Sequence, residues 1–240
     1  MPWLLSSPLD CASPSPCQRQ CERTAFSFYC AVRERLPAWL LEDMRGMEVF
    51  CWDDGRPRAF RPSEALLYAL VHDHQDYARV LLERYSVGAL RAPRCSFCRA
   101  RGGGAPHLAV AVRYDRVAIL GMMVRALRER EEAGERRRYL DECGACAHAP
   151  DAGKSAVQLA RARAQRCVDL LLLFVAEPPR PRCVREEPQR WRGLLGGRVF
   201  GWLRGVSPPP LLLQALRSLA RSGPDQISTL PVFLQPQLGR

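Results

Sequence analysis

The sequence predicts an all-α protein, a short solenoid of paired helices between an N-terminal helical cap and a C-terminal helical box. The first observation is a pattern that occurs three times: a short apolar helix with an alanine near its end, a polar turn, and a helix with two apolar residues, one free position and three more apolar residues. The second is helix length, since segments of about 8 to 10 residues are too short to be stable alone. A repeated helix pair is typical of stacking modules, which bind other molecules rather than transform them.

The three copies differ in the length of the segments between them. They occupy residues 66–69 with 77–82, 108–111 with 119–124, and 157–160 with 167–172. Their second helices begin at Tyr77, Ile119 and Cys167, which are 42 and then 48 residues apart. Since a bare unit of this kind needs about 33 residues, we expect insertions before the second and third copies.

Changes in composition divide the chain into four parts. We expect a disordered tail over 1–22, the helical cap over 23–58, about three repeats with insertions over 59–178, and C-terminal helices over 185–240. The tail is rich in proline and serine and has no apolar periodicity, which is typical of disorder.

Proline, serine and aspartate mark boundaries in the first half of the chain. Pro37 is expected to end a helix of the cap, and residues 53–55, Asp-Asp-Gly, predict a turn. Ser63, which follows Pro62, can cap the first helix of the repeats. These residues place the cap before the first repeat.

The C-terminal part has boundaries of its own. Gly196-Gly197 is expected to break an amphipathic helix pair over 191–202. Ser207 followed by Pro208 predicts the start of a last helix, because serine caps helices well and proline suits a first turn. That helix is expected to run to about residue 220.

The charge is strongly basic but interspersed. The net charge is +11, and of 36 basic side chains only Lys154 is a lysine. Two alternative causes would give this shortage of lysine: a GC-rich gene, or selection against lysine in a protein that acts beside ubiquitin-transfer machinery. Arginine alternates with glutamate over 128–132, which is typical of a solvated face rather than a nucleic-acid site.

We expect a cytosolic protein with reduced thiols. The run at Trp3 is too short for a secretory signal, and the longest apolar stretch, 170–176, is far below the roughly 20 residues of a membrane span. Eleven cysteines in such a chain indicate free thiols rather than disulfides.

The repeated unit resembles the ankyrin repeat. Residues 151–160 read D-x-G-x-S-A-V-Q-L-A where that family has D-x-G-x-T-P-L-H-L-A. A helical bundle without repeats is the alternative, but the gaps between the apolar blocks recur to within a residue. Residues 26–29, 39–45, 62–75 and 233–236 further resemble an ankyrin-repeat family with a C-terminal suppressor-of-cytokine-signalling-like box. Around residues 140–180 this chain is shorter than that family, by what corresponds to one repeat.

The last helix resembles an elongin-binding box. Leu211, Ala215 and Leu219 follow Pro210 at the spacing of such boxes, which puts them on one helical stripe with Leu211 as the anchor. Further on, Leu230-Pro231-Val232-Phe233 resembles the Leu-Pro-apolar-Pro element that selects cullin-5, with Phe233 in place of the last proline. Alternatively, this helix only caps the open end of the repeats, and both roles are compatible because a helix has two faces.

The resemblance implies a non-catalytic substrate receptor of a cullin-RING ubiquitin ligase. Its partners would be elongin B/C and cullin-5, and its implied target is IMP dehydrogenase. The alternative is an ankyrin scaffold without ligase function, followed by a metal-binding or enzymatic protein. Gly102-Gly103-Gly104 lacks the Lys-Ser/Thr of a phosphate loop, and no nucleophile motif is present.

Two further sets of residues are candidates for ligands. The pairs Cys95-x-x-Cys98 and Cys143-x-x-Cys146 could form a four-thiolate zinc site, since both fall in insertions at the same edge of the stack. The alternative is free thiols, with no cofactor. His72 and His74 flank a turn, where we expect backbone hydrogen bonds rather than a metal or proton role.

Overall fold

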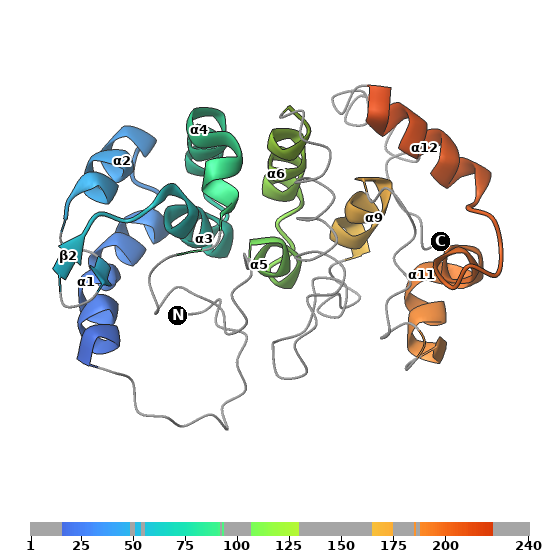
Figure 1. The fold of residues 1–240 in the computed structure, drawn as a ribbon, viewed down its shortest axis with the longest axis horizontal. Coiled ribbons are helices and arrows are strands. Elements are labelled where there is room, and N and C mark those ends of the chain that lie inside the picture. Colours follow the sequence, from blue (N-terminus) through green and yellow to red (C-terminus); the bar gives the residue numbers. More distant parts are fainter. Residues whose placement is uncertain are drawn as a thin grey trace.

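The computed structural model describes residues 16–48, 51–53, 56–91, 93, 107–129, 165–174, 185 and 188–222, and this part of the chain is mostly helical (Figure 1). The helices are α1 (Pro16–Arg33), α2 (Ala38–Gly46), α3 (Pro62–His72), α4 (Gln75–Tyr85), α5 (His107–Arg113), α6 (Val117–Glu129), α9 (Gln165–Phe174), α11 (Pro188–Leu203) and α12 (Leu211–Ser222). A 3₁₀ helix, η1 (Ser86–Leu90), follows α4, and a hairpin, β1 (Cys51–Asp53) and β2 (Arg56–Arg58), follows α2.

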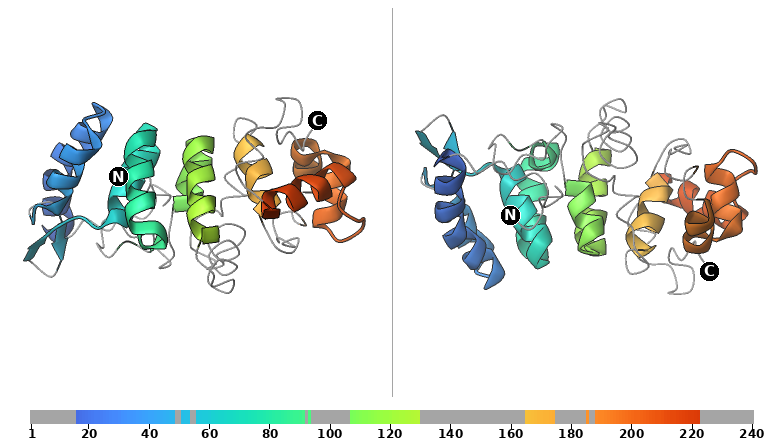
Figure 2. Two further views of the ribbon diagram at one scale, coloured as in Figure 1. Left: turned by 90° about the horizontal axis from the view of Figure 1, so that it is seen from above. Right: turned by 90° about the horizontal axis from the view of Figure 1, so that it is seen from below.

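The helices are arranged in two neighbouring rows. One row packs α1 on α3 and α3 on α5, and the other packs α2 on α4, α4 on α6, α6 on α9 and α9 on α12. Figure 2 shows the helices side by side from α1 to α9, with α11 and α12 at the far end. The second helices of the three sequence copies are α4, α6 and α9, as predicted. The first helix of the third copy, 157–160, lies outside the described residues.

The same backbone turn joins three consecutive helix pairs. In each pair, an amide donates a hydrogen bond to an alanine carbonyl five residues earlier, at 3.1 Å for Leu36 to Ala31, 2.9 Å for His74 to Ala69 and 2.8 Å for Arg116 to Ala111. The residue before each donor is left-handed, with φ of 57° at Arg35, 53° at Asp73 and 55° at Asp115. This bond satisfies a carbonyl that the end of a helix leaves open. The cap helices α1 and α2 are therefore joined in the same way as the repeats.

The side chain that follows this turn ties each unit to the preceding one. His74 Nδ1 accepts a hydrogen bond from the Tyr77 amide at 3.3 Å, so its Nε2 donates to the Leu36 carbonyl at 3.0 Å. At the equivalent position, Arg116 donates to the carbonyls of Leu70 and Val71, both at 2.8 Å. These bonds satisfy backbone carbonyls at the end of the neighbouring unit and help to fix its position.

The core runs along the whole row of helices. Buried apolar side chains from α1 to α12 form one cluster. At the N-terminal end this cluster is aromatic: the ring of Phe28 lies 5.3 Å from Phe60 and 5.4 Å from Tyr68, centre to centre. Since aromatic side chains bury large apolar areas, they fill the space between the cap and the first repeat.

The described residues are mostly helical, consistent with the predicted all-α class, and they also include a short antiparallel hairpin that was not predicted. Strand β1 pairs with β2 in a register that places Asp53 opposite Arg56, and β1 packs against α1. The sequence predicted a turn at 53–55 but no strands around it. Three residues on each side are too few to give an alternating pattern that a reader of the sequence could recognise.

Three helices begin at other residues than the sequence predicted. Helix α1 starts at Pro16, inside the segment that was expected to be a disordered tail. Helix α3 starts at Pro62 and not after Ser63; the Arg61 amide donates to Glu64 Oε2 at 2.7 Å, so Glu64 caps this end. Helix α12 starts at Leu211, three residues after Pro208.

Ser207 serves the end of α11 and not the start of α12. The amides of Val206 and Ser207 donate to the Gly201 carbonyl at 2.9 and 3.3 Å. A Cβ on Gly201 would lie 2.7 Å from Ser207 Oγ, so a larger residue here would require the serine side chain to move. Within α11, Gly196 has φ 73° and ψ 155°, which confirms the predicted break.

Candidate partner-binding surface

Helix α12 is held at the end of the row by its buried face. Leu213, Leu216 and Ala220 are buried, and the helix packs against α9. Arg217, also buried, lies over the ring of Trp202 in α11, with its guanidinium carbon 5.1 Å from the ring centre. The helix therefore caps the exposed end of the repeats, which is one of the two roles that the sequence suggested for it.

The opposite face of α12 exposes leucine and alanine side chains to solvent. Leu211 is 82% exposed and Leu212 48% exposed. Ala215 is exposed and Leu219 is half-buried. At about 100° per residue, positions 211, 215 and 219 advance by roughly 40° each and lie on one stripe of the helix. The three predicted box residues thus lie together on the exposed side.

Leu212 extends this stripe, although the sequence pattern did not include it. We call the exposed side chains of Leu211, Leu212, Ala215 and Leu219 the free face of α12. Single exposed leucines are common at protein surfaces, whereas neighbouring ones on a helix whose other face is already packed make a candidate interaction site. The free face is therefore the strongest candidate site within the described residues.

The segment before α12 orients its first turn. The Gln214 amide donates to the Pro210 carbonyl at 2.9 Å, and its side-chain Nε2 donates to the Pro209 carbonyl at 2.8 Å. Because prolines restrict the backbone, this segment presents Leu211 in a limited range of positions. Leu230, Pro231 and Phe233, which the sequence suggested for cullin-5 binding, lie outside the described residues.

The polar groups of α2 and α4 with shifted pKa values connect the cap to the first repeat. Glu42 accepts hydrogen bonds from Arg45 at 2.7 Å, Tyr85 at 2.8 Å and Tyr77 at 3.0 Å. Burial raises the pKa of Glu42, but the hydrogen bonds from Arg45 and Tyr85 outweigh it and the pKa is lowered overall. This network joins α2 to α4, and both arginine and carboxylate have their hydrogen-bonding groups occupied by protein partners.

His107, which the sequence analysis did not single out, joins α5 to α3. It is fully buried, and its Nε2 donates to the Ser63 carbonyl at 2.7 Å. Burial lowers its pKa to about 4, against a smaller opposing effect of that hydrogen bond. A neutral histidine in this position is a packing residue.

The histidines at the first repeat turn divide between two environments. His74 makes the backbone hydrogen bonds that were predicted. His72 instead packs edge-on against Tyr29 at 4.6 Å between ring centres. Burial, Arg33 and Arg116 lower the pKa of His72, so it favours the neutral form.

The predicted zinc ligands cannot be placed in space. Cys95, Cys98, Cys143 and Cys146 all lie outside the described residues, and the zinc site stays a prediction. Within the described part of the chain, Cys30 and Cys167 are not in disulfides, and the Cys167 thiol donates a hydrogen bond to Asp115 Oδ1 at 3.4 Å. No group of three or more His, Cys, Asp or Glu side chains in this part is arranged to hold a metal ion. Across the same residues, no helix is both long and apolar enough to cross a membrane.

Comparison with known proteins gives one informative similarity. Ankyrin repeat domain-containing protein 9 from Mus musculus is 34% identical over an alignment of 300 positions that covers 91% of this chain and 90% of that protein. Because the alignment is longer than the 240 residues of this chain, part of the relative's sequence lies opposite gaps. No family model matches the chain, and no solved structure matches it.

Proposed function

The chain belongs to the family of ankyrin repeat domain-containing protein 9, and we propose that it is the substrate-recognition subunit of a cullin-RING ubiquitin ligase of the elongin and cullin-5 type. Family membership makes it an ankyrin-repeat protein with a role in protein interaction. The recurring turn and the two rows of helices support a short ankyrin solenoid as the scaffold of that role.

The free face of α12 is the single observation that carries the ligase proposal. An elongin-binding helix needs a leucine that fills a pocket on the partner and a small residue one turn later that permits close approach. Leu211, 82% exposed, and Ala215 have these properties on the same stripe. The other face of the helix is occupied by α9, so a partner can cover the free face without displacing the helix from the repeats.

The proposed mechanism is proximity. The repeats hold the target, α12 docks elongin B/C, and an enzyme recruited through cullin-5 transfers ubiquitin to the target. The protein itself forms no covalent intermediate in this scheme. By resemblance, the target is IMP dehydrogenase, and the proposed site of action is the cytosol.

The second candidate is an ankyrin scaffold without ligase function. The packing of α12 on α9 favours it, because a terminal helix that covers the end of the repeats has a sufficient structural role without a partner. The two candidates differ in one respect: only the first requires the free face of α12 to bind elongin.

A binding experiment with purified elongin B–elongin C complex separates the candidates. We expect Leu211→Asp to weaken binding by at least about a hundredfold, since a charge would enter an apolar pocket at the anchor position. The matched control is Gln189→Asp, which adds the same charge to an exposed position on α11, outside the free face. We expect this control to change the Kd by less than about threefold.

Two results would contradict the ligase proposal. If the wild-type chain does not bind elongin, the scaffold candidate replaces it. If Leu211→Asp and Gln189→Asp weaken binding equally, the free face is not the site. Circular dichroism of each variant establishes that a loss of binding does not come from unfolding.

A further inference from the structure

The C-terminal unit, which we define as residues 188–222, concentrates positive charge. It contains no Asp or Glu and six arginines: Arg190, Arg192, Arg198, Arg204, Arg217 and Arg221. More than half of the net charge of +11 therefore comes from this short part of the chain. Arg217 is buried, whereas Arg190, Arg192, Arg198 and Arg204 are exposed, and the exposed charges attract acidic partners over a distance of roughly a Debye length.

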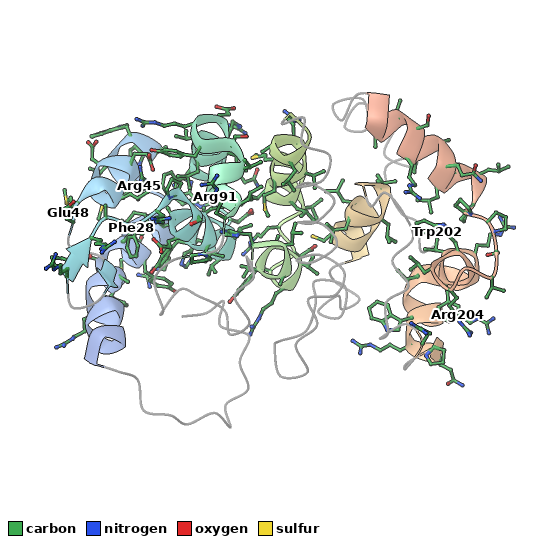
Figure 3. The ribbon with its side chains drawn as sticks, viewed as in Figure 1. Phe28, Arg45, Glu48, Arg91, Trp202 and Arg204 are labelled. Carbon is green, nitrogen blue, oxygen red and sulfur yellow. The ribbon has the colours of Figure 1, made fainter. Side chains whose placement is uncertain are left out.

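Two of these arginines are held over one aromatic ring. The guanidinium carbon of Arg192 lies 5.8 Å from the centre of the Phe200 ring, and that of Arg204 lies 5.7 Å from it. Phe200 is only 5% exposed, whereas both arginines are exposed. Arg192 precedes the break at Gly196 and Arg204 follows the end of α11, so the bend of this helix brings the two side chains to the same ring. Figure 3 shows Arg204 beside α11 and below Trp202.

The exposed pair differs from several arginines of the N-terminal half. In the N-terminal half, Arg33, Arg45 and Arg79 each form an ion pair with a carboxylate. Arg192 and Arg204 form no ion pair with any residue that the structure describes. The guanidinium heads themselves lie over the ring, which restricts their orientation, while both side chains stay exposed. Two oriented guanidinium groups bind carboxylates with less further loss of entropy than free ones.

We propose that Arg192 and Arg204 form a carboxylate-binding pair that docks an acidic segment of a partner protein. Val206, two residues after Arg204, is 75% exposed and gives the segment an apolar contact beside the charges. Guanidinium groups bind carboxylates through two parallel hydrogen bonds, and two fixed forks favour a segment with neighbouring acidic residues. This site goes beyond the proposed function, because it requires neither elongin nor the free face of α12.

A protein segment fits this surface better than a membrane or a single-stranded nucleic acid. An interfacial membrane helix needs a broad apolar face, whereas Val206 is a single apolar side chain at the arginine pair. Binding of single strands uses exposed aromatic rings for base stacking, and Trp191, Phe200 and Trp202 are all buried. The remaining chemistry is paired positive charge with one apolar contact.

The test uses the full chain and a fluorescein-labelled peptide that alternates Glu-Asp pairs with single valines. Fluorescence anisotropy at low salt gives the Kd. We expect Arg192→Glu with Arg204→Glu to weaken binding at least tenfold. The matched control, Arg79→Glu with Arg91→Glu, changes the net charge equally at the N-terminal half, and we expect less than a threefold effect.

A second double variant separates fixed forks from bulk charge. Arg192→Lys with Arg204→Lys keeps both charges but removes the planar groups, and we expect binding at least threefold weaker than wild type. This variant also carries the test if the glutamate variant does not fold. Equal binding by the lysine variant and wild type, or equal losses in the two glutamate variants, would overturn the proposal.

Competition experiments distinguish this site from other ligands and from the proposed function. One outcome would overturn the proposal: the wild type binds phosphatidylserine vesicles or polyuridylate RNA through the same two arginines but does not bind the peptide. Leu211→Asp is expected to retain peptide binding while it loses elongin. A wild-type chain that binds the peptide but not elongin would therefore contradict the ligase proposal alone.

Discussion

Two leucines of α12, Leu211 and Leu213, are two residues apart but are expected to contribute very differently to the free energy of unfolding. Leu213 is fully buried against the end of the repeats, whereas Leu211 is 82% exposed. Replacement of a buried leucine by alanine removes apolar contacts and leaves a cavity, which costs about 2–5 kcal/mol in the free energy of unfolding. The exposed Leu211→Ala substitution is expected to change it by less than about 0.5 kcal/mol.

The assay must resolve local opening as well as global unfolding. Because α12 is at the end of a stack, Leu213→Ala is expected first to detach this helix, and the other units can stay folded. Amide hydrogen exchange measured by mass spectrometry reports the opening of α12 and α9 separately from α3 and α4. We expect Leu213→Ala to accelerate exchange in α12 and α9, and Leu211→Ala to leave exchange in all four helices unchanged.

A particular result would refute this reasoning. If Leu211→Ala accelerates exchange in α12 as much as Leu213→Ala does, then Leu211 packs in the folded protein and the free face is not free. Elongin binding provides an independent comparison, because Leu211→Ala should weaken it directly. Leu213→Ala should weaken it only by the fraction of molecules in which α12 has opened.

Two further predictions concern the polar groups that join the N-terminal units. Glu42→Gln is expected to lower the free energy of unfolding by about 1–3 kcal/mol, because Arg45 loses a charged partner in a part-buried site. Urea denaturation measures this loss, and the control substitution at the exposed Glu83, Glu83→Gln, should have a smaller effect. For His107, the buried side chain has a pKa of about 4, against 6.5 for a free histidine, so the unfolded chain takes up the proton first as the pH falls between these values. Stability of the wild type should therefore decrease from pH 6.5 toward pH 4, by on the order of 2–3 kcal/mol more than in a His107→Gln variant, and urea midpoints that shift in parallel for both proteins would contradict this.

The sequence correctly predicted those parts of the fold in which the regularly spaced apolar residues are also the buried ones. The second helices of the copies, α4, α6 and α9, were found because each places an apolar block against the next unit. The cap pair was not recognised as a unit of the same kind. Its turn, from Ala31 to Leu36, matches the others, but α2 has an exposed Trp39 where α4 has the buried Tyr77. A terminal helix with a neighbour on one side does not need the full apolar block.

The helix boundaries show where local rules were overridden. Ser207 and Ser63 both have the side chain of a good cap, yet neither caps a helix start. The Ser207 amide donates a hydrogen bond to the Gly201 carbonyl at the end of α11, and Ser63 is buried inside α3, where its carbonyl accepts a hydrogen bond from His107. Neither partner belongs to the helix start that the serine was expected to cap, so cap propensity did not reveal these contacts.

The sequence pattern of α12 does not tell which face of the helix is buried. The pattern of Leu211, Ala215 and Leu219 defines a stripe, but any amphipathic helix could bury that stripe. Only the packing of Leu213, Leu216 and Arg217 leaves it exposed. Because the buried face must be docked for the free face to be presented in one orientation, a partner that binds only the docked helix also stabilises its docking, by an amount that grows with partner concentration relative to Kd. Binding at α12 and packing of α12 on the end of the repeats are therefore thermodynamically linked. A substitution that loosens the contact between α9 and α12 lowers the affinity for the partner, although the substituted residue does not contact the partner.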